Sequence, residues 1–277
     1  MNKVTRINAT LVKSVLPKVR PADHKGNRGH ALMIGGSYGK MGAICLAAEA
    51  ALRAGCGLVT AQIPRCGYDI LQTRIPEVMT VTDNNSHVIS DMAVSVTADA
   101  IGIGPGMGTR PETANAFDQF LRGNMHPLVI DADAINLLAA NPALHHFITG
   151  CILTPHSREF ERLTSGSATV ENAQSFSEKF NFIVVLKGAS THVITPAAIF
   201  QNTTGNVALA TGGSGDVLTG IIAGFLAQGL PPADAATAGV FVHGLTADLA
   251  TVNSSRRSFI ASDILRYLGK ALHAINR

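Results

Sequence analysis

Short apolar runs alternate with longer helical stretches along most of this chain, from residue 31 to residue 228. Most of the short runs are continuously hydrophobic, as expected for strands that are buried on both faces. We expect strands over 31–34, 58–63, 78–81, 100–103, 128–131, 152–154 and 182–186. We expect helices over 42–54, 111–121, 134–140, 157–163, 170–179, 215–227, 233–250 and 262–273. This alternation predicts an α/β fold, with a mostly parallel central sheet covered by helices on both faces.

The spacing of the apolar runs changes after residue 187. Segments 191–195 and 198–201 lie too close together for a helix to connect them, and Pro196 and Ala197 fit a turn between them. We therefore expect an antiparallel hairpin near one edge of the sheet. Because no low-complexity linker divides the chain, we expect residues 1–277 to form a single domain.

Composition and charge exclude several classes of function. The chain is 46% hydrophobic and 15% charged, has 27 glycines, and carries a net charge of +3 without basic runs, so nucleic-acid binding has little support. The first twenty residues lack the continuous apolar stretch that a secretory signal contains. The most apolar segment, 217–230, is interrupted by glycines and is shorter than the roughly 20 residues of a membrane span. We therefore predict a cytoplasmic enzyme without a membrane partner, and a buried helix over this segment.

The four cysteines form neither the close pairs of a zinc site nor a disulfide scaffold. We expect them to be reduced core residues: Cys45, Cys56, Cys66 and Cys151.

A glycine-rich turn at 210–218 carries the strongest chemical signal. Gly212, Gly213 and Gly215 stand with Ser214 directly before a long apolar helix. Since the start of a helix offers unpaired N–H groups, glycines there let a phosphate approach the backbone closely. The alternative is an ordinary helix start capped by the Ser214 side chain.

Asp216 favours the phosphate-binding interpretation. A carboxylate next to an anion site repels the anion, so its presence calls for a chemical reason. General-base catalysis on a substrate hydroxyl is such a reason. We therefore predict Asp216 as the catalytic base.

Two further strand ends supply candidate ligand contacts. Lys187 begins the stretch Lys187, Gly188, Ala189, Ser190 and Thr191, where a lysine suits a phosphate, although a solvated turn lysine is the alternative. His156 follows the strand 152–154 and has two possible roles, binding a substrate or capping the next helix.

The segment 131–136 offers Asp131, Asp133 and Asn136 at another strand end. Metal binding, substrate binding and helix capping all fit these residues, with capping the default role for Asp133. We assign no metal ligands from the sequence, although Mg²⁺ is expected to accompany a nucleotide diphosphate.

The glycines of 102–108 do not match the dinucleotide-binding spacing in any register. They allow either a close approach of the backbone to a ligand or merely a tight turn.

In order and spacing, these segments resemble the ADP-dependent NAD(P)H-hydrate dehydratases of the ribokinase-like superfamily. The resemblance runs from about Lys25 to about Leu249. Its parts are His24 to Gly29, Ile34 to Ser37, Gly42–Ala43, Ala50 to Gly55, Gly104 to Gly108, Asp131 to Ala134, Leu153 to His156, Lys187–Gly188, Gly205–Asn206 and Gly212 to Leu218. Ser214 stands where the family usually has threonine, and it keeps the hydroxyl group.

The resemblance implies a ribokinase-like three-layer fold and a lyase that repairs hydrated NADH and NADPH (NADHX and NADPHX) in their S form. ADP, or ATP, would be consumed, and NAD(P)H, AMP and phosphate released. It also implies a homo-oligomer, a tetramer, and a separate epimerase as functional partner. Ala43, Gly106, His156 and Asp216 would contact the hydrated dinucleotide, with Asn136 a further candidate. Residues 187–191, Gly213, Ser214 and Gly215 would hold the adenine nucleotide.

Two other functions remain open on the sequence. A vitamin-precursor kinase of the same fold would use the same turn and base for simple phosphoryl transfer. A non-catalytic nucleotide sensor is the other alternative, and the presence of Asp216 counts against it.

Overall fold

A computed structural model describes residues 4–276 of the chain. They build one ten-stranded sheet in the order β1-β10-β9-β8-β7-β6-β5-β2-β3-β4. The strands are β1 (Val4–Arg6), β2 (His30–Ile34), β3 (Leu58–Ile63), β4 (Met79–Thr82), β5 (Ala100–Ile103), β6 (Leu128–Ile130), β7 (Ile152–Leu153), β8 (Ile183–Leu186), β9 (His192–Ile194) and β10 (Ile199–Gln201). Neighbouring strands are parallel except where β9 runs against β8 and β10.

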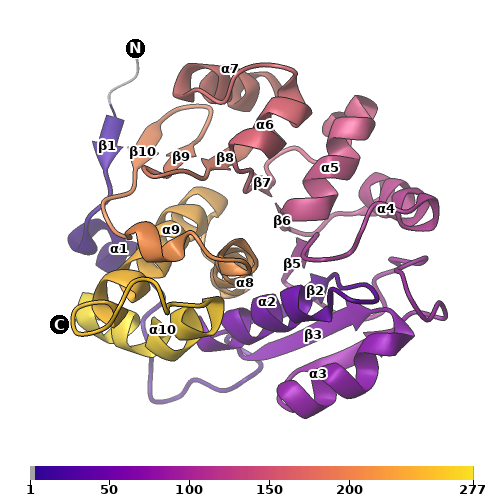
Figure 1. Ribbon diagram of the computed structural model, residues 1–277, viewed down its shortest axis with the longest axis horizontal. Helices are drawn as coiled ribbons and strands as arrows, with labels where there is room; N and C mark the ends of the chain where they lie inside the picture. Colours follow the sequence, from indigo (N-terminus) through magenta and orange to yellow (C-terminus); the bar gives the residue numbers. More distant parts are fainter. Residues whose placement is uncertain (1–3, 277) are drawn as a thin grey trace.

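Helices cover both faces of the sheet (Figure 1). The α-helices are α1 (Ala9–Val15), α2 (Met41–Arg53), α3 (Tyr68–Arg74), α4 (Pro111–Gly123), α5 (Ala132–Ala140), α6 (Ser157–Thr164), α7 (Val170–Phe180), α8 (Ser214–Ala227), α9 (Pro232–Ala250) and α10 (Ala261–Asn276). Short 3₁₀ turns occupy η1 (Arg65–Gly67), η2 (Pro142–Phe147) and η3 (Val207–Leu209). The three-layer α/β prediction and the antiparallel hairpin are confirmed.

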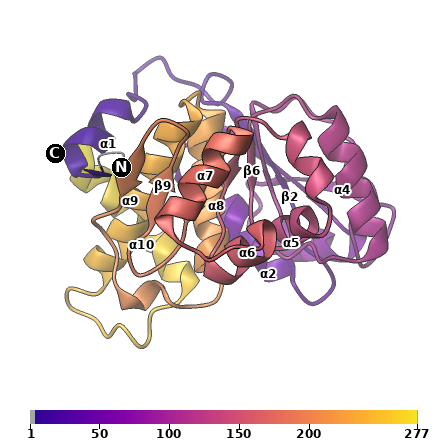
Figure 2. The same ribbon diagram turned by 90° about the horizontal axis from the view of Figure 1, so that it is seen from above.

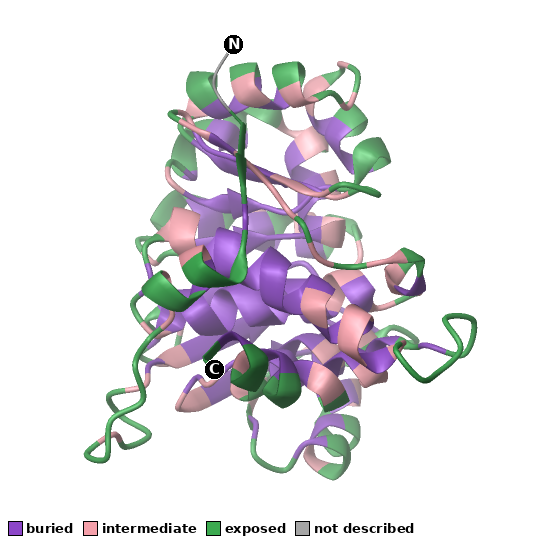
Figure 3. Cartoon of the chain, turned by 90° about the vertical axis from the view of Figure 1, so that its left-hand side faces the viewer, coloured by how far each residue is buried: buried purple, intermediate pink, exposed green. Residues whose placement is uncertain are grey.

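Alternate residues of each strand enter two separate cores. On β2, Ala31 and Met33 pack into the core beneath α2, α8, α9 and α10, whereas Leu32 and Ile34 pack into the core beneath α4, α5, α6 and α7. Because both faces are covered there, the central parallel strands β5, β6, β7 and β8 are continuously apolar. Figure 3 shows the buried residues concentrated in the sheet and the helices packed on it, and the exposed residues on outer helices and loops.

The sequence analysis missed the start of the chain. Strand β1 pairs in parallel with β10 outside the hairpin, and its three residues are all exposed. Figures 1 and 2 place the two chain ends on the same side of the molecule. There, Lys13 Nζ of α1 donates to the Asn276 carbonyl of α10 over 3.0 Å. Helix α3 was also missed.

Helix α8 is buried almost throughout, which confirms the prediction for the apolar segment after Asp216. Across residues 4–276, none of the helices combines the length and apolar character needed to cross a membrane. Cys45, Cys56 and Cys151 are buried thiols as expected, and Cys66 is partly buried and packs against the edge of the core.

Glycines bring α8 against the backbone of α2. A Cβ atom on Gly220 would lie 2.0 Å from the Ala47 carbonyl oxygen, and one on Gly224 would lie 2.7 Å from that of Ala51. Neither position has room for a side chain. The close contact of the two helices fixes where α8 begins.

We expect Gly220→Ala to lower the free energy of unfolding by about 1–3 kcal/mol, because the added methyl group forces the two helices apart. Gly269→Ala in α10 is the matched control, since a Cβ atom there meets nothing within 4 Å. It should gain roughly 0.5–1 kcal/mol from helix propensity. Urea denaturation measures both, and equal values for the two variants would contradict this account of the α2–α8 contact.

Candidate active site

Three neighbouring parallel strands bring predicted site residues to one edge of the sheet. Asp131 follows β6, His156 lies just beyond β7, and Lys187 follows β8. His156 and Lys187 form an isolated parallel bridge, in which the Lys187 amide donates to the Pro155 carbonyl over 2.9 Å. The carboxyl ends of parallel strands are where open α/β sheets bind ligands.

Helix α8 begins at the same edge. Gly213 is its N-cap residue with φ +88°, and no side chain among residues 4–276 caps the helix. Capping by Ser214, the alternative left open by the sequence, is therefore wrong: its Oγ lies 3.2 Å from Nε2 of His243. The Ser214 amide donates to the Thr211 carbonyl over 3.4 Å, which leaves the amides of Gly215 and Asp216 for a ligand, and a helix start of this kind favours an anion.

A cavity of about 820 Å³ brings most of the predicted residues together. Its lining includes His156, Lys187, Gly188, Ala189, Thr191, Gly213, Ser214, Gly215 and Asp216. The carboxylate of the predicted base therefore shares a cavity with the lysine, the histidine and the start of α8.

Lys187 is held by a buried carboxylate. Its Nζ lies 2.9 Å from Asp131 Oδ1 and 3.9 Å from Glu159 Oε2. Burial lowers the pKa of Lys187, but Asp131, Glu159 and Asp216 more than offset that effect and raise its pKa overall, so it is a cation. Thr219 of α8 donates to Asp131 Oδ2 over 2.7 Å and fixes that carboxylate from the other side.

Gly215 keeps space open beside this cation. A Cβ atom there would lie 3.2 Å from Lys187 Nζ and 3.7 Å from Asp131 Oδ2. The glycine therefore leaves the ammonium group accessible next to the first turn of α8.

Asp216 is a carboxyl group poised to exchange a proton near neutral pH. Burial and the nearby Asp131 raise its pKa to about 7, with smaller contributions from Asp133 and Glu159, and Lys187 partly opposes the shift. A base of this pKa accepts a proton efficiently at neutral pH.

Asp131 and Asp133, on either side of Ala132, have different partners. Ala132 has φ +48°, a left-handed conformation that is uncommon for a residue with a side chain. Asp131 faces Lys187, whereas Asp133 Oδ2 accepts the Gly108 amide over 2.9 Å and lies 3.6 Å from Lys40 Nζ. The default role for Asp133, capping α5, is wrong, because the Gly108 amide occupies its carboxylate instead.

His156 is a helix cap that also lines the cavity. Its Nδ1 accepts the Arg158 and Glu159 amides at the start of α6, in a capping box with Glu159. Of the two roles left open by the sequence, capping is therefore confirmed. Because about half of its side chain is exposed and it lines the cavity, contact with a ligand is still available to it.

Four predicted residues lie outside the cavity lining: Ala43, Gly106, Asn136 and Ser190. Ala43 and Gly106 lie side by side, since a Cβ atom on Gly106 would come within 3.0 Å of that of Ala43. Asn136 Oδ1 accepts a hydrogen bond from Arg162 over 3.1 Å, and Ser190 Oγ accepts one from Gln201 over 2.9 Å.

The glycines of 102–108 form a tight turn, one of the two roles considered. Gly104, Gly106 and Gly108 all have positive φ, and a Cβ atom on Gly104 would lie 1.9 Å from the Asp131 carbonyl oxygen. The close approach is thus between the backbone of Gly104 and the backbone of Asp131.

The sequence analysis missed several residues of the cavity. His243 of α9 and the segment from Asn202 to Ala210 also line it. Asp248 holds this segment, because its carboxylate accepts the Gly205 amide over 2.7 Å and Asn206 Nδ2 over 2.9 Å. The pair Gly205–Asn206 was the one signal in the sequence that marked the segment.

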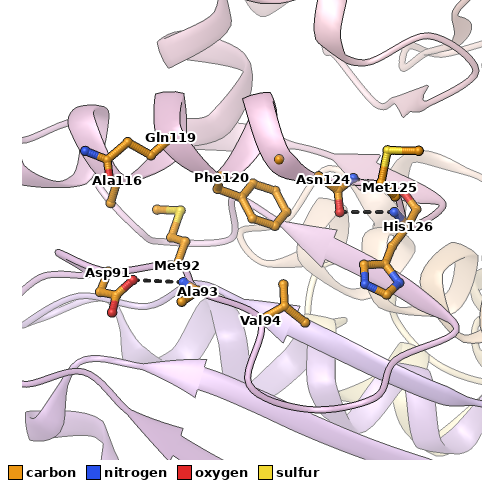
Figure 4. A pocket seen from close by; sticks show the side chains of 11 residues that line it. Asp91, Met92, Ala93, Val94, Ala116, Gln119, Phe120, Asn124, Met125 and His126 are labelled. Atoms are coloured by element: carbon orange, nitrogen blue, oxygen red, sulfur yellow. Dashed lines mark hydrogen bonds between the residues drawn. The ribbon is translucent and has the colours of Figure 1, made fainter.

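A second cavity, of about 440 Å³, lies beside the end of α4 (Figure 4). Met92, Phe120 and Met125 line it, and Asp91 is engaged by the Ala93 amide over 2.9 Å. None of the predicted residues borders it. The larger cavity, with its buried charges, is therefore the candidate active site.

Comparison with known proteins assigns the chain to a family. A family model described as NAD(P)H-hydrate dehydratase matches residues 31–270. The chain belongs to this family.

The relatives include single-function and two-function enzymes. The ADP-dependent (S)-NAD(P)H-hydrate dehydratase of Neisseria meningitidis is 38% identical over 84% of this chain and 81% of its own length. The bifunctional NAD(P)H-hydrate repair enzyme Nnr of Moorella thermoacetica is also 38% identical, over 95% of this chain. The chain spans about half the length of such bifunctional relatives, 52% in that case.

Solved structures confirm the fold. The ADP/ATP-dependent NAD(P)H-hydrate dehydratase of Bacillus subtilis, co-crystallized with ATP and Mg²⁺, superposes with a TM-score of 0.86 at 28% identity, covering 99% of both chains. A ribokinase-like superfamily protein of Enterococcus faecalis gives a TM-score of 0.87 at 29% identity over 98% of this chain and 96% of its own. The ribokinase-like prediction is therefore confirmed.

We expect Asp216→Asn to be more stable than the parent protein at pH 8, by on the order of 1–3 kcal/mol. The pKa of Asp216 is about 7 in the folded state against an ordinary value of 3.8. The charged carboxylate therefore lowers the free energy of unfolding, and this cost, which the amide avoids, is complete above pH 7. The gain should shrink as the pH falls through 7 and vanish near pH 4. Urea denaturation at both pH values measures it.

The exposed Glu161 supplies the control, since Glu161→Gln should change little at either pH. A gain for Asp216→Asn that is the same at pH 8 and pH 4 would contradict the electrostatic explanation.

Proposed function

We propose that this protein dehydrates the S form of hydrated NADH and NADPH at the expense of ADP, releasing NAD(P)H, AMP and phosphate. One observation carries the proposal: Asp216, with a pKa of about 7, shares a cavity with Lys187 and the uncapped start of α8. A base, a cation and a set of free amides are the parts that phosphoryl transfer to a hydroxyl group requires. Family membership and the name of the Neisseria relative support the choice of substrate.

In the first step, Asp216 accepts the proton of the substrate hydroxyl group. The oxygen then attacks the terminal phosphorus of ADP, and the bond from that phosphorus to the bridging oxygen breaks, so that AMP leaves. Lys187 and the amides of Gly215 and Asp216 face the transferring group and stabilise its charge. The hydroxyl group is thereby converted into a phosphate ester, a far better leaving group.

In the second step, the phosphate leaves with the electrons of its carbon–oxygen bond. The neighbouring carbon loses a proton, and the carbon–carbon double bond of the nicotinamide ring is restored. Atoms balance, because the oxygen of the lost water leaves in the phosphate, and its two hydrogens leave as the hydroxyl proton taken by Asp216 and the proton released from the ring carbon. The reaction is that of a carbon–oxygen lyase.

In this proposal the nucleotide and the hydrated dinucleotide bind on different sides of Asp216. Residues 187–191 with Gly213, Ser214 and Gly215 hold the nucleotide. Ala43, Gly106 and His156 contact the hydrated dinucleotide, with Asn136 at its periphery. The paired positions of Ala43 and Gly106 and the half-exposed side chain of His156 on the cavity wall support this division.

Mg²⁺ is expected to accompany the nucleotide in this proposal. Among residues 4–276 no cluster of three or more potential ligands is preassembled, but Mg²⁺ in nucleotide sites commonly uses one or two carboxylates together with the phosphates. The carboxylates next to Lys187 are already engaged, Asp131 by Lys187 and Thr219 and Glu159 by the His156 amide, so the nucleotide phosphates would hold the ion. When bound, the ion supplies charge neutralisation on the phosphates.

Several finer features belong to the same proposal. ADP is the co-substrate, and ATP is the alternative, because the Bacillus relative is named as ADP/ATP-dependent. The enzyme is a cytoplasmic homotetramer and works with a separate epimerase, which converts the R form into the S form. Sedimentation of the purified protein tests the assembly.

We expect ADP and hydrated NADH, incubated with the protein, to yield AMP and to regain the near-ultraviolet absorbance of NADH. Omitting the nucleotide should abolish the recovery, and comparing ADP with ATP identifies the preferred co-substrate. A phosphorylated alcohol that accumulates without absorbance recovery would instead indicate a small-molecule kinase of the same fold.

We expect Asp216→Asn to bind ADP with an affinity close to that of the parent protein but to lose turnover by about 10²-fold or more, because the amide cannot accept the hydroxyl proton. Calorimetric titration gives the affinity and the absorbance assay gives the rate. The exposed-site variant Glu161→Gln should retain both. Turnover by Asp216→Asn at the parental rate would remove this residue from the mechanism.

A further inference from the structure

His243 is a buried histidine on the wall of the candidate active site to which the proposed mechanism gives no role. It lies on α9, is 8% exposed and faces the first residue of α8. Its Nε2 lies 3.0 Å from the Ser214 carbonyl oxygen and 3.2 Å from Ser214 Oγ. Both contacts link one nitrogen to the residue that opens the helix.

These contacts determine where the imidazole hydrogen resides. A carbonyl oxygen only accepts hydrogen bonds, so a 3.0 Å contact with it requires a hydrogen on Nε2. The opposite tautomer would place two lone pairs face to face. Burial lowers the pKa of His243 to about 4. The hydrogen bond to Ser214 opposes this shift and the Lys187 cation adds to it, so the ring is neutral at physiological pH. It thus donates without adding charge to the cavity.

The tautomer also orients the Ser214 hydroxyl group. Because Nε2 carries a hydrogen, Ser214 Oγ accepts from His243, and its own hydrogen is left for another acceptor. Gly213 before it is in a left-handed conformation, and the helix start has no side-chain cap among the described residues. His243 is therefore the side chain that restrains the residue at the opening of α8.

We propose that His243 is a positioning residue for the nucleotide: its Nε2–H holds Ser214 so that the hydroxyl group and the amides opening α8 face the terminal phosphate. This inference rests on the proposed nucleotide site but not on the dehydration step. It extends the site to a side chain that contacts the nucleotide only through Ser214.

Two variants with direct ADP titration test the inference. His243→Leu fills the space without a donor and should weaken ADP binding about tenfold, the loss expected for one hydrogen bond that orders a phosphate site. His243→Gln, whose amide nitrogen reaches a similar position, should restore most of the affinity. Adenosine lacks the phosphates, so its binding should be the same in both variants and in the parent protein.

Thr237→Val removes another buried polar group from α9 and serves as the control for folding, with ADP affinity unchanged. Thermal melting of each variant separates instability from weak binding. Equal ADP affinity in His243→Leu and the parent protein, or equal losses for ADP and adenosine, would overturn the inference. If ADP binds but the absorbance does not recover, the proposed reaction is refuted. The ADP affinities of the His243 variants would still test the positioning role.

Discussion

The contact between α8 and α2 is the constraint on which the site depends. Gly220 and Gly224 let the two helices touch through their backbones, and the contact sets the position of α8 along its own axis. That position brings the unpaired amides of the first turn to the carboxyl edge of the sheet. Had either glycine a side chain, the helix would be displaced from Lys187 and Asp131. Packing in the core thus determines the geometry of the chemistry.

The charges around the start of α8 balance one another. Lys187 is neutralised by Asp131, and Asp131 is in turn fixed by Thr219. A second carboxylate, Asp216, is therefore pushed toward its neutral form by burial and by Asp131. A site with one committed ion pair and one carboxyl group near its titration point can accept an anion and still provide a base.

The sequence predicted those features that depend on local patterns. The parallel strands and most helices follow from continuous apolar runs and helical spacing, and Asp216 was found because its turn combines glycines with an acidic residue. Strand β1 was missed because three exposed residues carry no apolar pattern. Local rules also failed where a distant partner competes: Ser214 bonds His243, and Asp133 bonds Gly108, instead of capping their own helices. The Lys187–Asp131 pair joins residues 56 positions apart, a separation that no local pattern reveals.

The left-handed backbone at Ala132 has a consequence for how firmly the two neighbouring carboxylates are held. A residue with a side chain costs roughly 1–2 kcal/mol in that conformation, and glycine would avoid the cost. The same turn aims Asp131 at Lys187 and Asp133 at Gly108, and alanine permits fewer alternatives to it than glycine does. Glycine at position 132 would therefore relieve the backbone strain but hold the two carboxylates less firmly, so the charge arrangement beside Lys187 is defined by a residue in an unfavourable conformation.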